Sequence, residues 1–154
     1  INNHGTYYDM QLADFALFIG DKKLARKVIT DQTFPRIDQQ FTVDGAEPLE
    51  LIRTKSWSYA TMNLVGWCKL AVVADRIGID LWHQQTMDGK GIRRVFEWFT
   101  PYLLKEKEWK YEQIEPVSYS NILSIFWLAN KKYANAFEKV IVLYPNNKLE
   151  KPWW

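Results

Sequence analysis

The sequence predicts an all-α protein, and three observations support this class. Apolar residues recur at helical spacing in several separate segments, and no segment shows the sustained alternation of apolar and polar residues that marks strands. The helical segments also follow one another in pairs, without a sequence repeat of fixed period. We therefore expect stacked antiparallel helical hairpins.

The positions of the helices follow from the apolar spacing. A central, most buried helix is expected to start between residues 48 and 56 and to end at Gly78, because its apolar pattern is the strongest. Residues 145–154 are expected to be irregular. The other helices are expected over residues 7–19, 22–31, 91–104, 119–132 and 135–143.

Capping signals define the first pair of helices. Thr6 and Asp9 have the spacing of a capping box, so Thr6 is expected to cap the first helix. Gly20 would close a tight turn, and Asp21 would cap the next helix. Residues 33–48 contain two prolines and an Asp-Gly turn signal, and they are expected to form a long ordered loop.

Composition and charge exclude several classes of protein. Hydrophobic residues make up 47% and charged residues 25%, which excludes a disordered or collagen-like chain. The net charge of +2 is too small for a general binder of nucleic acid or membrane surfaces. No apolar run reaches the roughly 18 residues of a membrane span, so we expect neither nucleic acid nor a membrane as a partner. The single cysteine, Cys68, excludes an internal disulfide.

Common catalytic and metal-binding motifs are missing from the sequence. It contains no glycine-rich phosphate loop, no HExxH, no GxSxG and no EF-hand pattern, and two histidines with one cysteine do not complete a common zinc site. What remains are two polar clusters at expected helix starts, residues 2–6 and 53–59. Free backbone N–H groups and the positive end of the helix dipole favour an anionic ligand there, such as a carboxylate.

Those clusters belong to a set of short motifs in a specific order. They read NNHGTxYD at 2–9, DGxxPLELxRT at 44–54, WxY at 57–59, NL at 63–64 and DLW at 80–82. In order and spacing they resemble the alginate lyase family over roughly residues 1–104. Several motifs together make this a far more specific signal than any one of them.

The resemblance implies a fold and a division of the protein. It implies an incomplete (α/α) toroid of antiparallel helical hairpins, in which a further helical half precedes the Asn-His motif. Residues 1–154 would then be the C-terminal part of one catalytic domain, with the N-terminal half absent from this chain and expected as a partner. The resemblance also implies a periplasmic or secreted protein that requires no metal or other cofactor.

The activity implied is that of a polysaccharide lyase. Such an enzyme cleaves a β-1,4-linked polyuronate of the alginate or polymannuronate type by β-elimination: a base removes the C5 proton, the glycosidic bond at C4 breaks, and a 4,5-unsaturated uronate end remains. By resemblance Asn3, His4 and Arg53 neutralise the uronate carboxylate, and Tyr59 moves the proton. Where base and leaving group lie on opposite faces of the sugar, His4 is the expected base.

Further residues are expected to bind the substrate. The set comprises Asn2, Lys55, Trp57 and Asn63. Trp57 is expected either in the core or as a platform for a sugar ring. Lys55, Tyr59 and Asn63 are spaced four apart, a polar stripe that favours a groove. Glu50 is expected to be a structural partner, with Arg53 as its candidate.

One geometric condition applies to this site. Arg53 and Tyr59 are six residues apart, which corresponds to about 240° around a continuous helix. The two side chains can therefore cooperate only if the helix begins at or after Arg53. Three alternatives stay open: a lyase for glucuronan or another polyuronide, a non-catalytic uronate-binding domain, and a purely structural helical domain.

Overall fold

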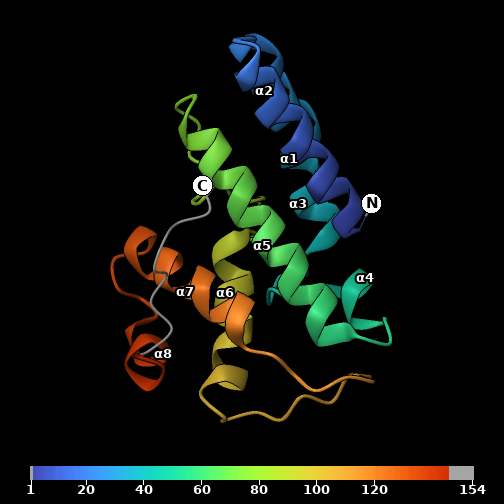
Figure 1. Cartoon of the computed structure of the whole chain (residues 1–154), viewed down its shortest axis with the longest axis vertical. Coiled ribbons are helices and arrows are strands. Elements are labelled where there is room, and N and C mark those ends of the chain that lie inside the picture. Colours follow the sequence, from blue (N-terminus) through green and yellow to red (C-terminus); the bar gives the residue numbers. More distant parts are fainter. Residues whose placement is uncertain (1, 146–154) are drawn as a thin grey trace.

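The structure, a computed structural model, describes residues 2–145, and these residues form helices without a strand (Figure 1). The all-α prediction is confirmed. The elements are α1 (Asn3–Phe18), α2 (Lys22–Val28), the π-helical turn η1 (Ile29–Thr33), α3 (Phe34–Gln40), α4 (Pro48–Leu51), α5 (Ser56–Asp75), α6 (Ile92–Leu103), α7 (Ser120–Lys132) and α8 (Glu138–Leu143). Residues 146–154 of the expected irregular tail lie outside the described residues.

Helix α1 begins earlier than the capping signals predict. Asn2 is the N-cap, and its Oδ1 accepts a hydrogen bond from the backbone N–H of His4 (3.4 Å). Thr6 and Asp9 lie inside the helix and are fully buried. The Asp9 carboxylate accepts two hydrogen bonds from the guanidinium of Arg36 (2.8 and 2.9 Å). The predicted cap at Thr6 is wrong because both polar side chains of the capping pattern make tertiary contacts instead.

The second helix is longer than predicted, and the predicted loop over 33–48 is wrong for its first half. Asp21 caps α2 as expected, through a hydrogen bond of 2.9 Å to its side chain. From α2 the chain passes through η1 directly into α3, so that residues 22–40 form one helical segment. The wider π-helical turn accommodates Pro35, which has no N–H for a regular helix. Only residues 41–47 are loop.

This long segment packs antiparallel to α1 and makes the first hairpin. Gly20, with φ +81°, closes the turn between the two arms. At the open end of the hairpin, Gln40 Nε2 donates to the backbone carbonyl of Asn2 (2.9 Å). The predicted hairpin closed by Gly20 is therefore present, with a second arm that extends to the start of α1.

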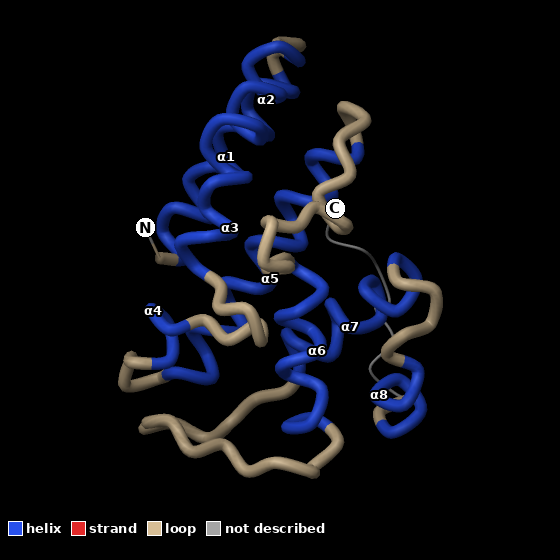
Figure 2. The backbone as a smooth tube through the Cα atoms, turned by 180° about the vertical axis from the view of Figure 1, so that it is seen from behind, coloured by secondary structure: helices blue, strands red, loops and turns tan. Residues whose placement is uncertain are grey.

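Helix α5 is the central helix, as predicted, and it begins at Ser56. It lies between the hairpin of α1 to α3 on one side and α6, α7 and α8 on the other, as Figures 1 and 2 show from opposite sides. Its large side chains Trp57, Leu64, Trp67 and Leu70 are at most 2% exposed. The last three helices lie within three residues of their predicted bounds. None of the described helices combines the length and the apolar character that a membrane span needs.

Helices α1 and α5 run parallel and close together. The Tyr7 hydroxyl donates to the backbone carbonyl of Met62 (3.0 Å), and further along the two helices Arg76 pairs with Asp14 (3.3 Å). Gly66 permits this approach, because a Cβ at that position would lie 3.0 Å from the ring of Tyr7. Both helices therefore start at the same end of the molecule, which brings the two polar clusters of the sequence together.

Candidate active site

The start of α1 presents one exposed functional side chain, His4. Its imidazole Nδ1 lies 3.2 Å from Oδ1 of Asn2, the residue that caps the helix. His4 is exposed and Asn2 is half-buried. Asn2 thus both caps the start of the helix and contacts the imidazole, which is exposed to solvent.

A carboxylate already occupies the N-terminus of α1. Glu50, from α4, accepts hydrogen bonds from the backbone N–H and from Nδ2 of Asn3, both 2.7 Å long. Both residues are buried, at 1% and 2% exposure. The sequence predicts that this helix start favours an anionic group, and the protein supplies that group itself. Glu50 is a structural partner as expected, although its partner is Asn3 and the expected pairing with Arg53 is wrong.

Arg53 and Tyr59 meet across the turn between α4 and α5. Arg53 lies in this turn, and its backbone N–H donates to the carbonyl of Glu50 (3.1 Å). Because α5 begins only at Ser56, the Arg53 side chain can fold back, and its Cζ lies 4.0 Å from the centre of the Tyr59 ring. The geometric condition that the sequence sets for these two residues is met.

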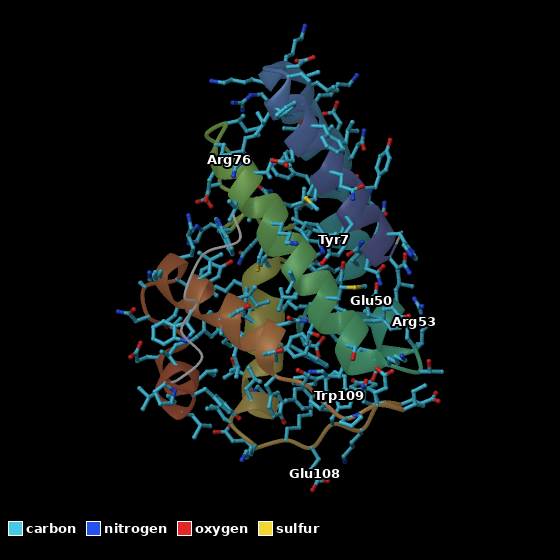
Figure 3. All side chains as sticks on the ribbon, in the orientation of Figure 1. Tyr7, Glu50, Arg53, Arg76, Glu108 and Trp109 are labelled. Carbon is cyan, nitrogen blue, oxygen red and sulfur yellow. The ribbon has the colours of Figure 1, made fainter. Side chains whose placement is uncertain are left out.

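His4 and Tyr59 lie at corresponding positions of the parallel helices. Tyr7 contacts Met62, and each candidate precedes one member of this pair by three residues, which is almost one helical turn. The structure therefore brings His4, Arg53 and Tyr59 to one end of the α1/α5 pair. In Figure 3, Tyr7, Glu50 and Arg53 mark this region.

Lys55 is held by a segment from another part of the chain. Residues 112–115, in the loop before α7, run along the backbone that leads into α5, with hydrogen bonds from Ile114 N–H to the carbonyl of Thr54 (3.0 Å) and a bridge at Lys55 (Figure 1). The Lys55 ammonium pairs with Glu115. This hydrogen bond raises the pKa of Lys55 above its usual value, and the nearby Tyr59 adds to the effect. Lys55 is thus a cation close to Tyr59.

Trp57 belongs to the core. It is 2% exposed, and its ring centre lies 4.9 Å from that of Trp109 and 5.3 Å from that of Tyr119. Its indole N–H donates to the backbone carbonyl of Ser118 (2.8 Å). Of the two alternatives for this residue, the structure favours the core, because the ring has no free face for a sugar. Figure 3 shows Trp109 beneath the start of α5.

Asn63 also faces inward and is 1% exposed. Its Nδ2 donates to Gln40 and to Glu47 (both 2.9 Å), and its Oδ1 accepts from the Thr6 hydroxyl (2.8 Å). The expectation that Asn63 contacts the substrate is wrong, because all these contacts lie under α1 and α3. The predicted polar stripe on α5 therefore reaches the surface only over its first part.

Glu47 is a buried carboxyl group inside this polar network. It is 1% exposed, and its Oε1 has no hydrogen-bond partner among the described residues. Burial raises the pKa of Glu47 well above 4.5, and the charge of nearby Glu50 raises it further, whereas the hydrogen bond from Asn63 acts in the opposite direction.

Three acidic residues of this region have contacts that the sequence analysis did not predict: Glu47, Glu50 and Glu115. Glu47 and Glu50 flank a Pro-Leu pair in a four-residue helix, and nothing local shows that both are buried. The only sequence feature that pointed to a role for these two residues was their position between an Asp-Gly turn and Arg53. Glu115 lies 60 residues from Lys55, so no pattern could have paired them.

Comparisons with known proteins agree with the motifs. The sequence profile of the alginate lyase family matches residues 1–109. A crystal structure of an alginate lyase from Bacteroides ovatus superposes on 98% of this chain with a TM-score of 0.86 and 31% sequence identity. The chain spans 40% of the length of that lyase. No curated protein sequence matches this chain significantly.

The structural match confirms that the helical hairpins are part of an incomplete (α/α) toroid. The profile match extends over more than two thirds of the chain and includes the residues around both helix starts. From the family profile and the shared fold together, we conclude that this chain belongs to the alginate lyase family.

Proposed function

We propose that this chain carries the carboxylate-binding and proton-transfer groups of a polysaccharide lyase that cleaves β-1,4-linked polyuronates by β-elimination. The observation that carries this proposal is the contact of Arg53 with Tyr59, at 4.0 Å from guanidinium carbon to ring centre. Arg53 makes no ion pair within residues 2–145, so its charge is available to a uronate carboxylate beside the phenol.

Tyr59 would remove the proton from C5 of the sugar. The electrons of that C–H bond form the 4,5 double bond, and the C4–O4 bond breaks. Charge develops on the neighbouring carboxylate, where Arg53 would stabilise it. The Asn3 amide is buried and donates to Glu50, so its part in the reaction would be indirect: it holds the start of α1, and with it His4, in place.

Tyr59 would give the proton to the leaving O4, and the geometry of the sugar decides which residue is the base. When the C5 proton and O4 lie on one face of the ring, Tyr59 can return the proton that it removed. When they lie on opposite faces, the exposed imidazole of His4 is the base and Tyr59 the acid. The two side chains come from different helices, which is consistent with such a division of roles.

The path of the polymer would follow the junction of α1 and α5. A cavity of 290 Å³ lies there, lined by Tyr7, Met62, Val65, Lys69 and Asn121. Met62 is almost one turn beyond Tyr59 on the same face of α5, so the cavity continues the site. Lys69 on this wall, with Asn2 and Lys55 at the other end, would bind further sugar units.

The substrate class proposed is alginate or polymannuronate, because the residues match an alginate lyase profile. Glucuronan is the alternative with the same chemistry, since mannuronate and glucuronate differ at C2, away from the elimination centre. A polymer of this kind is met outside the cytoplasm, so a periplasmic or secreted location belongs to the proposal.

We also propose that a further helical part of the lyase packs on α1. The outer face of α1 exposes a row of large apolar residues: Tyr8 (60%), Phe15 (66%), Phe18 (88%) and Ile19 (73%). Such a row is unusual on a surface that meets only water. This chain matches only 40% of the Bacteroides ovatus lyase chain, which is consistent with a further part of the lyase outside this chain.

The test is an assay for unsaturated ends. The protein is incubated with polymannuronate, polyguluronate and glucuronan, and absorbance of the conjugated 4,5 double bond is followed, with binding measured in parallel by calorimetry. The proposal predicts product from at least one polymer. Binding without product would show a uronate-binding domain instead, and neither binding nor product would favour a structural role.

A further inference from the structure

Glu50 is bonded to both parts of the chain that carry the candidate site. Its carboxylate accepts two hydrogen bonds from Asn3, the residue next to His4 (both 2.7 Å). Its own backbone carbonyl accepts the N–H of Arg53 (3.1 Å). One residue of α4 thus connects the start of α1 with the turn that holds Arg53. Figure 3 labels Glu50 between Tyr7 of α1 and Arg53.

The two hydrogen bonds from Asn3 to the Glu50 carboxylate are short and buried. An ionised carboxylate that accepts two N–H donors in a buried place makes shorter and stronger hydrogen bonds than neutral pairs do. Glu50 and Asn3 are 1% and 2% exposed, so water does not compete for these donors. The carboxylate also faces the first turn of α1, where the helix dipole favours negative charge.

The neighbouring Glu47 does not disturb this arrangement. Burial raises the pKa of Glu47 well above its usual value, and its one bonded oxygen accepts from Asn63 rather than from Asn3 or Arg53. Both donors of Asn3 therefore go to Glu50 alone. Glu47 lies three residues before Glu50 in the same network, and this makes it a matched control.

The pairing of Glu50 with Asn3 also leaves Arg53 free of an internal counter-charge. Both carboxylate oxygens of Glu50 are used by Asn3, and Arg53 has no ion pair in the described part of the chain. Had Glu50 paired with Arg53, the guanidinium would be neutralised before a substrate arrived.

We propose that Glu50 is a positioning residue of the elimination site, which sets the separation of His4 from Arg53 by binding Asn3 with its side chain and Arg53 with its backbone. This inference rests on the proposed function. Glu50 itself touches no substrate. Its contribution is to keep the groups that meet the uronate carboxylate in a fixed geometry, and an error of about 1 Å in such a geometry can cost roughly 100-fold in rate.

The experiment compares Glu50→Gln with the control Glu47→Gln. A glutamine at 50 can accept one hydrogen bond from Asn3, but its NH₂ group then faces the Nδ2 donor, so one bond is lost. At 47 a glutamine oxygen can still accept from Asn63. Steady-state kinetics on the best polyuronate, thermal melts and crystal structures are measured for both variants.

We expect Glu50→Gln to lower kcat by about 10–100-fold with a change in KM of less than about fivefold, since polymer binding is spread over other contacts. Glu47→Gln should keep kcat within about threefold of wild type. Equal losses in the two variants would overturn the inference, because they would show damage to the network as a whole. So would a folded Glu50→Gln variant with full activity.

Two further measurements keep the result decisive. If Glu50→Gln does not fold, Glu50→Asp keeps the charge but shortens the side chain by one methylene, and the same loss of kcat is expected. If the wild type forms no unsaturated product, the proposed function is wrong, and the crystal structures still test the positioning role of Glu50. In that case the separation of His4 and Arg53 should change by about 1 Å in the Glu50 variant and stay unchanged in the Glu47 variant.

Discussion

The guanidinium carbon of Arg53 lies 4.0 Å from the ring centre of Tyr59, although the two residues are six positions apart. On one continuous helix they would point in different directions. The contact exists because α4 ends at Leu51 and α5 begins at Ser56, which leaves Arg53 in a turn. The turn places a permanent cation against the side chain that we propose as the proton-transfer group.

Tyr59→Phe should abolish most of the activity without unfolding the protein. The change keeps the ring and its contact with Arg53 and removes only the hydroxyl. Loss of a general acid or base typically costs about 10²–10⁴-fold, and the loss of both roles at one residue should reach the upper end. The measurement is kcat on the best polymer, with Tyr111→Phe, at a tyrosine 38% exposed and outside the site, as control. Retention of more than about a tenth of the activity would contradict the mechanism.

Arg53→Ala should weaken both binding and turnover. The guanidinium charge acts on the substrate carboxylate in the ground state and on the larger charge of the transition state. We expect kcat to fall by about 10²–10³-fold and KM to rise. Arg53→Lys should be intermediate, because it keeps the charge but lacks the planar fork. Arg94→Ala, at a half-exposed arginine paired with Glu97, serves as the control, and an equal loss there would indicate a nonspecific charge effect.

Glu47→Gln should remove a pH dependence of stability. In the folded protein the pKa of Glu47 is well above 4.5, so the folded chain keeps a proton that the unfolded chain loses as the pH rises past that value. The free energy of unfolding of the wild type must therefore fall as the pH increases above about 4.5. The variant should be the more stable of the two near neutral pH, and this advantage should disappear at lower pH. Urea unfolding at several pH values tests this, and parallel curves for both proteins would show that Glu47 is not protonated.

The exposed face of α1 should make the chain self-associate when it is expressed alone. Phe15 and Phe18 are 66% and 88% exposed on one face, and their burial in an assembly would be favourable by the hydrophobic effect. Replacement of both by serine should shift the chain toward a monomer in sedimentation velocity. The control replaces Val142 and Leu143, which are 68% and 48% exposed on α8, and should leave association unchanged. A wild-type chain that stays monomeric at high concentration would count against a docking face.

Where the structure departs from the local sequence pattern, the cause is the same. Thr6 and Asp9 have capping spacing but act in buried contacts with other helices, and Pro35 was expected to break a helix that a π-helical turn continues. In each case a tertiary contact or the π-helical turn outweighed the local conformational preference that the sequence pattern indicates. Asn63 and Trp57 were candidates for substrate contact because single-sequence patterns do not show which side of a helix another element covers.

Local apolar spacing was enough to predict the helical class and the central helix. The order of the short motifs indicated the family and, through that resemblance, the candidate site residues His4, Arg53 and Tyr59. The tertiary structure decided which of them can act together. It paired Asn3 with Glu50, buried Glu47 and so raised the pKa of its carboxyl group, and brought Glu115 to Lys55 from 60 residues away. The physical reason is that burial and charge pairing depend on segments distant in the chain, and their proximity is set only when the helices pack.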